Sequence, residues 1–223
     1  MFIPKSVGDL LCRMPTGSFE AVTSRAVKVT VLPKQVLFDG CDAHGHLYIV
    51  LTGAIELTSF NTDSEALVGL AGPGDAVGCA AFATGHAEGT RATALNPATA
   101  WAWHRRVLLD IARSDKHITD WLLTIPAIAV RHLQDSLDAR RFSAGSSRIA
   151  ASLLRWTEVT GMDQMASPLV RVDQAMLARM AGVKRQTVSE AFSGFRARGW
   201  LAASSRMEWT ILDLAALRNH ARR

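Results

Sequence analysis

The chain has 223 residues, of which 48% are hydrophobic and 20% charged, and its mean hydropathy is +0.11. This length is sufficient for one large domain or two small ones. No apolar run approaches the roughly 18 residues that a membrane-spanning helix needs. The first residues, MFIPKSVGDLL, lack the long apolar segment and the cleavage site of a signal peptide. We therefore expect a cytoplasmic protein without membrane contact.

Three isolated cysteines, Cys12, Cys41 and Cys79, fit a reducing compartment, because they form no CxxC pair and are odd in number. An iron-sulfur cluster generally needs four thiolates, so none is expected, and the sequence identifies no other cofactor. No metal site is expected either. A P-loop, HExxH and GxSxG are all missing from the sequence, which argues against an enzyme.

Charge is unevenly distributed along the chain, whose net charge is +5. Residues 1–144 contain 13 Lys or Arg against 14 Asp or Glu, whereas residues 145–223 contain 12 against 6. A basic C-terminal part indicates a polyanionic partner for that part only, although a solvated basic surface would have the same composition.

Short strands are predicted over residues 17–104. The stretches VKVTVL, VLFDG, HLYIVLTGAIELTSF, ALVGLAGPGDAVG and TRATALNPATAWAW carry β-branched or aromatic residues bounded by turn formers. Glycines recur at the expected corners: Gly40, Gly53, Gly72, Gly74 and Gly78. No long helix alternates with these strands, so the pattern predicts a compact antiparallel β-roll and not a parallel α/β fold.

A long helical segment is predicted after His104. Its apolar residues follow the i, i+3, i+4 rule: Trp121, Leu122, Ile125, Ile128, Ala129, Leu133 and Leu137. This stripe could pack on the roll or pair with its twin in a dimer. Pro126 predicts a kink or a break between two helices, and FSAGSS (142–147) is the best candidate for a linker.

The remaining chain predicts a helix, a turn, a second helix and a two-stranded wing. Asp173 is a suitable N-cap, Gly182 fits the tight turn between the helices, and Gly199 closes the second helix. The stretch WLAASSRMEWTIL then forms the wing. The predicted fold class is α+β, with a roll at 1–114, a dimerisation helix and hinge at 115–144, and a winged helix-turn-helix at 145–223.

Arg185, Gln186 and Ser189 share one face in the first turns of the second helix. The first turns of a recognition helix enter the major groove. There, an arginine can donate two hydrogen bonds to guanine, and a glutamine can bond adenine in the same bidentate manner. Lys184 and Thr187 are better suited to phosphates, which position a protein on DNA.

Two further residues belong to this predicted surface. Arg206, at the tip of the wing, is a further expected phosphate contact. Glu190 is unusual there, because it repels phosphates unless it accepts from cytosine N4 or pairs with a neighbouring cation. The alternative to a DNA-reading surface is an ordinary solvated helical hairpin.

The sequence also carries motifs in a characteristic order: LYIVLTGAIEL (47–57), GPGDAVG (72–78), SRIAASLL, VKRQTVSEAF and the terminal MEWTILDLAALR. With these motifs the chain resembles the CRP/FNR superfamily of bacterial transcription regulators, from about Val27 to Ala221. The resemblance implies a β-roll effector domain, a long dimerisation helix and a winged helix that binds two-fold-related half-sites of double-stranded DNA. It also makes RNA polymerase an expected partner.

In the family, a motif R-E-T-V-x-R reads the half-site, and this chain has RQTVSE at 185–190. Arg185 carries over, Gln186 replaces a glutamate and Glu190 replaces the second arginine. We therefore expect a target that departs from the usual half-sites.

The effector pocket departs further from the family pattern. Members that bind cyclic AMP carry a glutamate after the glycine that corresponds to Gly78, where this chain has Cys79. Replacing a carboxylate with a thiol removes a charge-assisted acceptor for hydroxyl groups. Cys79 is interpreted as a buried thiol, or as a redox switch if a cation lowers its pKa.

The other cyclic AMP contacts of the family also differ. The Arg-Ser pair that holds the phosphate is matched by Arg91 and Ala92, and the polar pair on the long helix is matched by Leu133 and Gln134. Arg91 could hold another anion or form a structural ion pair. These changes predict a small effector other than cyclic AMP.

The predicted function is a homodimeric, sequence-specific DNA-binding transcription regulator whose affinity for DNA is modulated by an effector in the roll. Two alternatives remain open. One is a regulator of the same family that needs no effector, and the other is a small-molecule or redox-sensing module without a DNA function.

Overall fold

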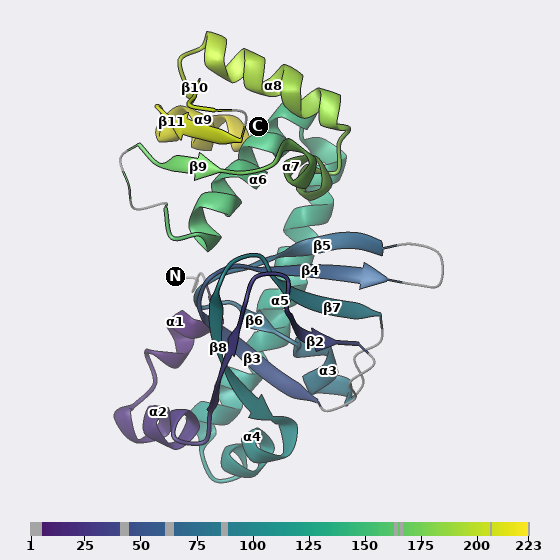
Figure 1. The fold of residues 1–223 in the computed structure, drawn as a ribbon. Helices are drawn as coiled ribbons and strands as arrows, with labels where there is room; N and C mark the ends of the chain where they lie inside the picture. The colour runs from purple at the N-terminus through teal and green to yellow at the C-terminus, as the bar shows by residue number, and fades with distance from the viewer. Residues whose placement is uncertain are drawn as a thin grey trace. The chain divides into compact units, whose positions relative to one another are not determined.

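The structure is a computed structural model that describes residues 6–40, 45–60, 65–85, 89–162, 165, 167–205 and 207–222. Contacts within the chain divide it into two compact units, Met1–Leu133 and Gln134–Arg223. The elements of each unit are labelled in Figure 1. The three-part division at residues 114 and 144 stays a prediction.

The N-terminal unit is an antiparallel β-roll preceded by two helices (Figure 1). Its described strands form two four-stranded sheets, with the orders β1-β8-β3-β6 and β2-β7-β4-β5. Every pairing in them is antiparallel. The helices and strands are α1 (Val7–Leu11), α2 (Thr16–Thr23), β1 (Val27–Val31), β2 (Val36–Asp39), β3 (His46–Thr52), β4 (Ile55–Phe60), β5 (Glu65–Ala71), β6 (Ala76–Val77), α3 (Cys79–Thr84), β7 (Thr90–Ala94) and β8 (Ala98–His104). The predicted roll is confirmed, but residues 17–23, expected to begin it, are helical.

Alternation along β3 creates two cores, because successive side chains of a strand point to opposite faces. Tyr48 and Val50 join residues of both sheets in an apolar cluster between the sheets. Leu47 and Ile49 face the other way and pack with residues of α1, α2 and two later helices, α4 (Arg105–Ala112) and α5 (Lys116–Phe142). In this second cluster Trp103 donates its Nε1–H to a backbone carbonyl of α2 at 2.9 Å, so its burial leaves no polar group unsatisfied.

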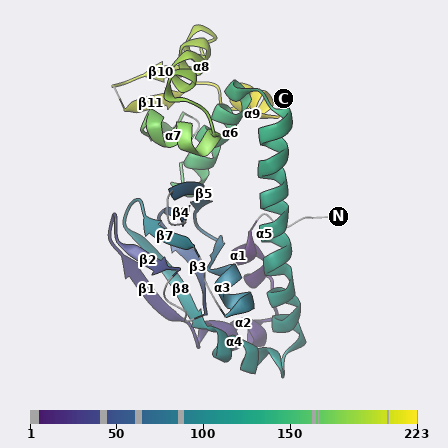
Figure 2. The same cartoon turned by 90° about the vertical axis from the view of Figure 1, so that its right-hand side faces the viewer.

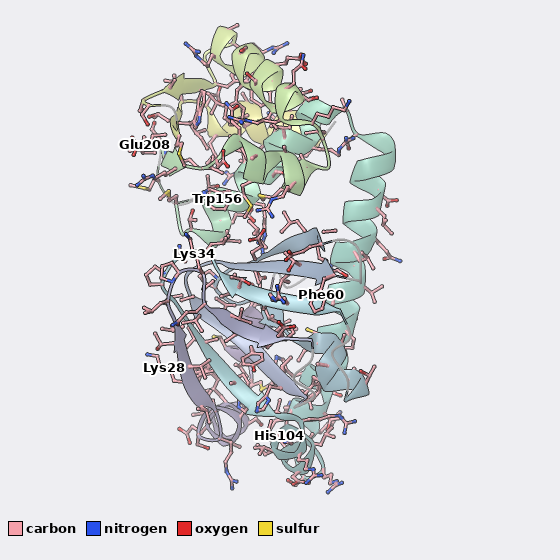
Figure 3. All side chains as sticks on the ribbon, turned by 45° about the vertical axis from the view of Figure 1, so that its right-hand side comes forward. Lys28, Lys34, Phe60, His104, Trp156 and Glu208 are labelled. Carbon is pink, nitrogen blue, oxygen red and sulfur yellow. The ribbon has the colours of Figure 1, made fainter. Side chains whose placement is uncertain are left out.

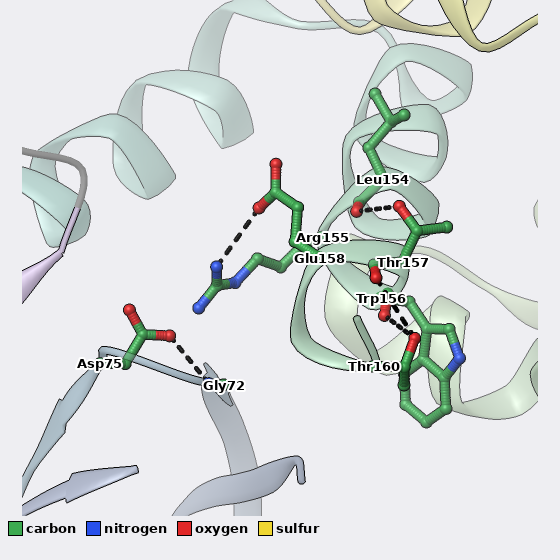
Figure 4. Close-up of polar contacts among 8 residues, drawn as sticks. All are labelled: Gly72, Asp75, Leu154, Arg155, Trp156, Thr157, Glu158 and Thr160. Atoms are coloured by element: carbon green, nitrogen blue, oxygen red, sulfur yellow. Dashed lines mark hydrogen bonds and ion pairs between the residues drawn. The ribbon is translucent and has the colours of Figure 1, made fainter. Parts of the chain in front are cut away.

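A tight turn joins β5 to β6 in the GPGDAVG motif. The amide of Gly72 donates to Asp75 Oδ2 at 2.8 Å, a contact drawn in Figure 4. Gly74 has a φ of 86°, a conformation that favours glycine. The motif therefore has a local backbone reason for Gly74 and for its aspartate.

The helix α5 (Lys116–Phe142) follows α4 (Arg105–Ala112) and runs along the roll (Figure 2). Asp115 caps its start by accepting from the amide of His117 at 2.8 Å. Pro126 lies inside the helix, which continues through it. The predicted break between two helices at this proline is therefore wrong. Pro126 is exposed on the helix, a position that is compatible with an uninterrupted α5.

Two separate apolar faces run along α5, where the sequence predicted one stripe. The buried face, which packs on the roll, consists of Ile118, Trp121, Ile125 and Ile128. The exposed face consists of Leu123, Val130, Leu133 and Leu137, which are 68%, 54%, 57% and 49% exposed. Spacings of seven, three and four residues place the exposed set in one heptad seam, on the side opposite the buried set. Leu133 and Leu137 therefore lie on a different face of α5 from Trp121, and not on one shared stripe as predicted.

The C-terminal unit is a winged helix-turn-helix. Its elements after the end of α5 are α6 (Gly145–Val159), β9 (Leu169–Arg171), α7 (Gln174–Ala181), α8 (Arg185–Ala197), β10 (Leu201–Ala203), β11 (Glu208–Ile211) and α9 (Leu214–Ala221). The sheet has the order β10-β11-β9, so the wing has three strands and not the two predicted. The helix α9 closes the same core, where Leu217 is fully buried.

The predicted linker at 142–147 is mostly helical. Phe142 still belongs to α5 and Gly145 already belongs to α6, which leaves Ser143 and Ala144 as the connection.

At the other end of α6, Thr157 Oγ1 donates to the carbonyl of Leu154, and Thr160 Oγ1 donates to that of Trp156, both at 2.7 Å (Figure 4). Among the described residues, no helix is both long enough and apolar enough to cross a membrane.

Candidate nucleic-acid interface

The turn between α7 and α8 is built from local backbone signals. Asp173 Oδ1 accepts from the amide of Ala175 at 3.2 Å and caps α7, as predicted. Gly182 ends α7 in the left-handed conformation with a φ of 61°, which also confirms the prediction. Lys184 is the N-cap of α8 in an extended conformation. Asp173 thus begins α7, and Gly182 and Lys184 form the turn from which α8 starts.

One face of α8 is anchored in the core of the unit. Val188, Phe192 and Phe195 are at most 1% exposed. The ring of Phe192 meets that of Trp209 edge to face, with the centroids 4.6 Å apart. An aromatic pair in this geometry contributes about 0.5–1.5 kcal/mol beyond the burial of its area. The helix is therefore held rigidly, and its opposite face is left at the surface.

The surface face of α8 begins with polar side chains. The exposed ones are Lys184, Arg185, Gln186, Ser189 and Glu190. Thr187 is partly buried because its methyl group lies against the start of α6: a Cβ added to Gly145 would be 3.5 Å from Thr187 Cγ2. The structure thus brings all six sequence-predicted residues of this helix to one short surface.

Gln186 Nε2 donates to Glu190 Oε1 at 3.0 Å across one helical turn. The partner of Glu190 is therefore an amide, not the neighbouring cation that the sequence suggested. This bond fixes which end of the Gln186 amide lies beside Glu190, and it leaves the second N–H and the carbonyl oxygen of the amide for a ligand.

In the wing, β10 and β11 form an antiparallel pair. Glu208, labelled in Figure 3, accepts through its backbone carbonyl from the amides of Ser204 and Ser205, at 2.9 and 3.2 Å. These bonds hold the turn that leads into the tip. Arg206, the predicted phosphate contact, lies outside the described residues.

Gly78 and Cys79, predicted for the effector pocket, form the start of α3. Gly78 has a φ of 82°, and a Cβ there would lie 2.6 Å from the carbonyl oxygen of His46, so only glycine fits. Cys79 packs against the cluster between the roll and the helices. Burial raises the pKa of the Cys79 thiol from 9.0 to about 11. The redox interpretation of Cys79 depended on a lowered pKa, and this expectation is therefore wrong.

Arg91 lies in β7 and forms an ion pair. Its Nε donates to Asp39 Oδ2 at 2.8 Å, and its guanidinium carbon lies 5.1 Å from the centroid of the Phe60 ring. Figure 3 labels Phe60 on the roll. The sequence predicts that Arg91 either holds an anion or forms a structural ion pair, and the structure shows the ion pair. Arg91 contacts Asp39 and Phe60, whereas Cys79 packs against the cluster between the roll and the helices.

Leu133 and Gln134 are both exposed on α5, on either side of the boundary between the two units. The sequence pattern did not indicate Phe38 and Tyr48, whose rings stack between the sheets with centroids 5.9 Å apart and planes 6° apart. The alternation of HLYIV could have shown that Tyr48 faces the interior, but not that it meets Phe38.

Each of the two units matches a known domain family. Residues 28–115 match the cyclic nucleotide-binding domain family, and residues 147–220 match the Crp-like helix-turn-helix domain family. Over 188 residues, the chain is 26% identical to a CRP-like cAMP-activated global transcriptional regulator of Mycobacterium tuberculosis, which covers 83% of this chain and 84% of that protein.

Solved structures share the fold. FixK2 from Bradyrhizobium japonicum has a TM-score of 0.74 at 19% identity and covers 87% of this chain and 96% of its own. A CRP/FNR family regulator from Thermus thermophilus has a TM-score of 0.73 at 18% identity, with coverages of 88% and 99%. With both domain families matched in this order, the chain belongs to the CRP/FNR superfamily and is a DNA-binding transcription regulator with a domain of the cyclic nucleotide-binding family.

Proposed function

We propose that the protein is a homodimeric regulator that reads two-fold-related half-sites of double-stranded DNA with α8. The observation that carries the proposal is the exposed polar edge at the start of α8, opposite a face that is anchored in the core. The first turns of a recognition helix are the part that reaches base edges. No enzymatic step belongs to the proposal, and the site of action is the cytoplasm, where bacterial DNA lies.

Each side chain of this edge has a chemical role in the proposal. Arg185 donates two hydrogen bonds to guanine O6 and N7. Gln186, oriented by Glu190, accepts from adenine N6–H and donates its second N–H to adenine N7. Lys184 and Thr187 bind phosphates, and Ser189 borders the same bases. Arg206 would add a phosphate contact from the wing.

The exposed seam of α5 supports the dimer. Four large apolar side chains at heptad spacing, all about half exposed or more, form a face that a second copy of the helix would cover. A dimer presents its two recognition helices about 34 Å apart, one turn of DNA. RNA polymerase is the further partner that a regulator of this kind requires.

We propose a small effector other than cyclic AMP for the roll. The relative in M. tuberculosis is described as cAMP-activated, but here a thiol with a raised pKa stands where a carboxylate would bind hydroxyl groups. The guanidinium of Arg91 pairs with Asp39. Phe38 and Tyr48 add stacked aromatic rings to the apolar cluster between the sheets, which suits a less polar ligand.

The test is selection of bound sequences from a random duplex library at physiological salt, first without ligand and then with cyclic AMP. Salt must be fixed because low ionic strength lets a basic domain bind any duplex. We expect a palindrome, with no gain from cyclic AMP. On the selected site, Arg185→Ala should cost about 1–3 kcal/mol and discrimination at one base pair.

Arg218→Ala is the matched control, because it removes an exposed arginine of α9, remote in sequence from the reading edge. It should leave the selected site and its affinity unchanged. Equal losses in Arg185→Ala and Arg218→Ala would reject α8 as the reading helix. A selection that enriches no sequence without ligand, with cyclic AMP or with a panel of other candidate effectors would reject the proposed function.

A further inference from the structure

Arg148 connects two helix ends that lie far apart in the sequence. It belongs to the first turn of α6, and it is partly buried. Its Nε donates to the carbonyl of Ala181 at 2.9 Å, and its Nη1 donates to the carbonyl of Ser143 at 2.8 Å. Ala181 is the last residue of α7, and Ser143 directly follows the end of α5. One guanidinium thus joins the end of α5 to the turn that precedes α8.

Both contacts place a cation where helix electrostatics favour one. The last carbonyls of a helix have no intrahelical partner and carry partial negative charge. Arginine suits this position because its planar fork presents separate N–H groups to two acceptors, whereas lysine offers one compact charge.

A second set of contacts ties the start of α6 to the other end of α8. Ser146 Oγ lies 3.1 Å from His220 Nε2. The imidazole ring of His220 meets the rings of Phe195 and Trp200, with centroids 5.5 Å away in each case. Phe195 lies in the last turns of α8, and Trp200 follows its end. The first turn of α6 therefore contacts the turn before α8 through Arg148 and the end of α8 through His220.

We propose that Arg148 is a positioning residue, which sets the orientation of α8 relative to the end of α5 without touching DNA. The inference rests on the proposed function and deepens it. Because α5 carries the seam proposed for the dimer, the orientation of α8 relative to α5 determines the spacing of the two half-sites that the dimer accepts. Losing the two hydrogen bonds of Arg148 lets α8 adopt a range of orientations.

The experiment compares Arg148→Met, Arg148→Lys and the control Arg218→Met in the full-length protein, using the selected palindrome and versions with one base pair added or removed between the half-sites. Thermal unfolding is recorded for each variant. We expect Arg148→Met to bind the palindrome about tenfold more weakly and to discriminate less between the three spacings. Arg148→Lys should lie between this variant and the wild type, and Arg218→Met should equal the wild type.

The salt dependence of binding separates positioning from direct contact. An arginine that binds a phosphate contributes about one unit to the slope of log affinity against log salt. Arg148→Met should keep the wild-type slope, and a slope lower by about one would overturn the inference. Unchanged spacing preference in Arg148→Met would also overturn it. If that variant does not fold, the spacing preference of Arg148→Lys decides in the same way.

The wild type is measured first. Failure of the wild type to bind any selected sequence would reject the proposed function as a whole. Specific wild-type binding together with unchanged spacing preference in the variants would reject only the role of Arg148.

Discussion

Glu190 shows how one side chain can alter the recognition chemistry of a helix. A carboxylate on a DNA-facing surface repels phosphates, and the bond from Gln186 gives it a local role instead. Pairs at i and i+4 are neighbours on a helix, so the glutamate restricts the amide that is proposed to read adenine. Where the family motif carries an arginine, this chain thus has an acceptor that orients Gln186, which supports the proposal of a changed half-site.

At Cys79, the raised pKa predicts low reactivity. At pH 7.5 a thiol with a pKa of about 11 is almost entirely protonated, and the thiolate is the nucleophile. Iodoacetamide should therefore modify the exposed Cys12 well before Cys79 in the folded protein. Mass spectrometry of the two peptides after timed alkylation gives the rates.

The same shift has a consequence for stability. The pKa of Cys79 is higher in the folded state than its ordinary value of 9.0. The contribution of this thiol to the free energy of unfolding is therefore complete below pH 9.0 and is lost as the pH rises towards 11.

For the alkylation experiment, denaturant is the control: in it the alkylation rates of Cys79 and Cys12 should converge. Equal rates in the native protein would contradict the protection of this partly buried thiol.

At the scale of elements, the helix-turn-helix depends on its terminal residues. Asp173→Ala removes the carboxylate that accepts from the amide of Ala175 at the start of α7. We expect a loss of about 1 kcal/mol in the free energy of unfolding of the C-terminal unit. Urea unfolding followed by tryptophan fluorescence measures it. Three of the six tryptophans, Trp156, Trp200 and Trp209, lie in this unit, and the other three give the reference transition of the N-terminal unit.

Asp173→Asn is the control for the cap, because asparagine keeps an acceptor oxygen at nearly the same position and is also a good N-cap. It should retain most of the stability. A loss in Asp173→Asn as large as that in Asp173→Ala would show that charge, and not the capping bond, is what the residue contributes.

At the scale of the whole molecule, the exposed seam of α5 predicts the oligomeric state. Changing both Leu133 and Leu137 to glutamate places two like charges in the seam of each helix, which should convert the proposed dimer into monomers. Sedimentation velocity at micromolar concentration distinguishes the two states. The variant should also lose cooperative binding to the two half-sites.

Leu32→Glu is the matched control, because Leu32 and Leu133 are both 57% exposed. It adds a charge to an apolar surface residue outside α5 and should remain dimeric. A wild type that sediments as a monomer, or a doubly substituted variant that sediments as a dimer, would contradict the proposed dimer interface.

Much of this molecule could be predicted from local patterns. The order of roll, long helix and helix-turn-helix follows from strand alternation, helical periodicity and turn residues. Gly182 and Asp173 have the roles expected of them, because a left-handed turn and an N-cap depend on only a few neighbouring residues. The polar edge from Lys184 to Glu190 follows in the same way from the helical period.

Contacts between distant residues were decided by the tertiary structure alone. Arg91 meets Asp39 because β7 pairs with β2, 52 residues earlier, and Arg148 reaches Ala181 across 33 residues. The division of α5 into a buried and an exposed face likewise required the roll that covers one of them. A sequence pattern specifies which residues share a face, whereas packing of distant segments determines what that face meets.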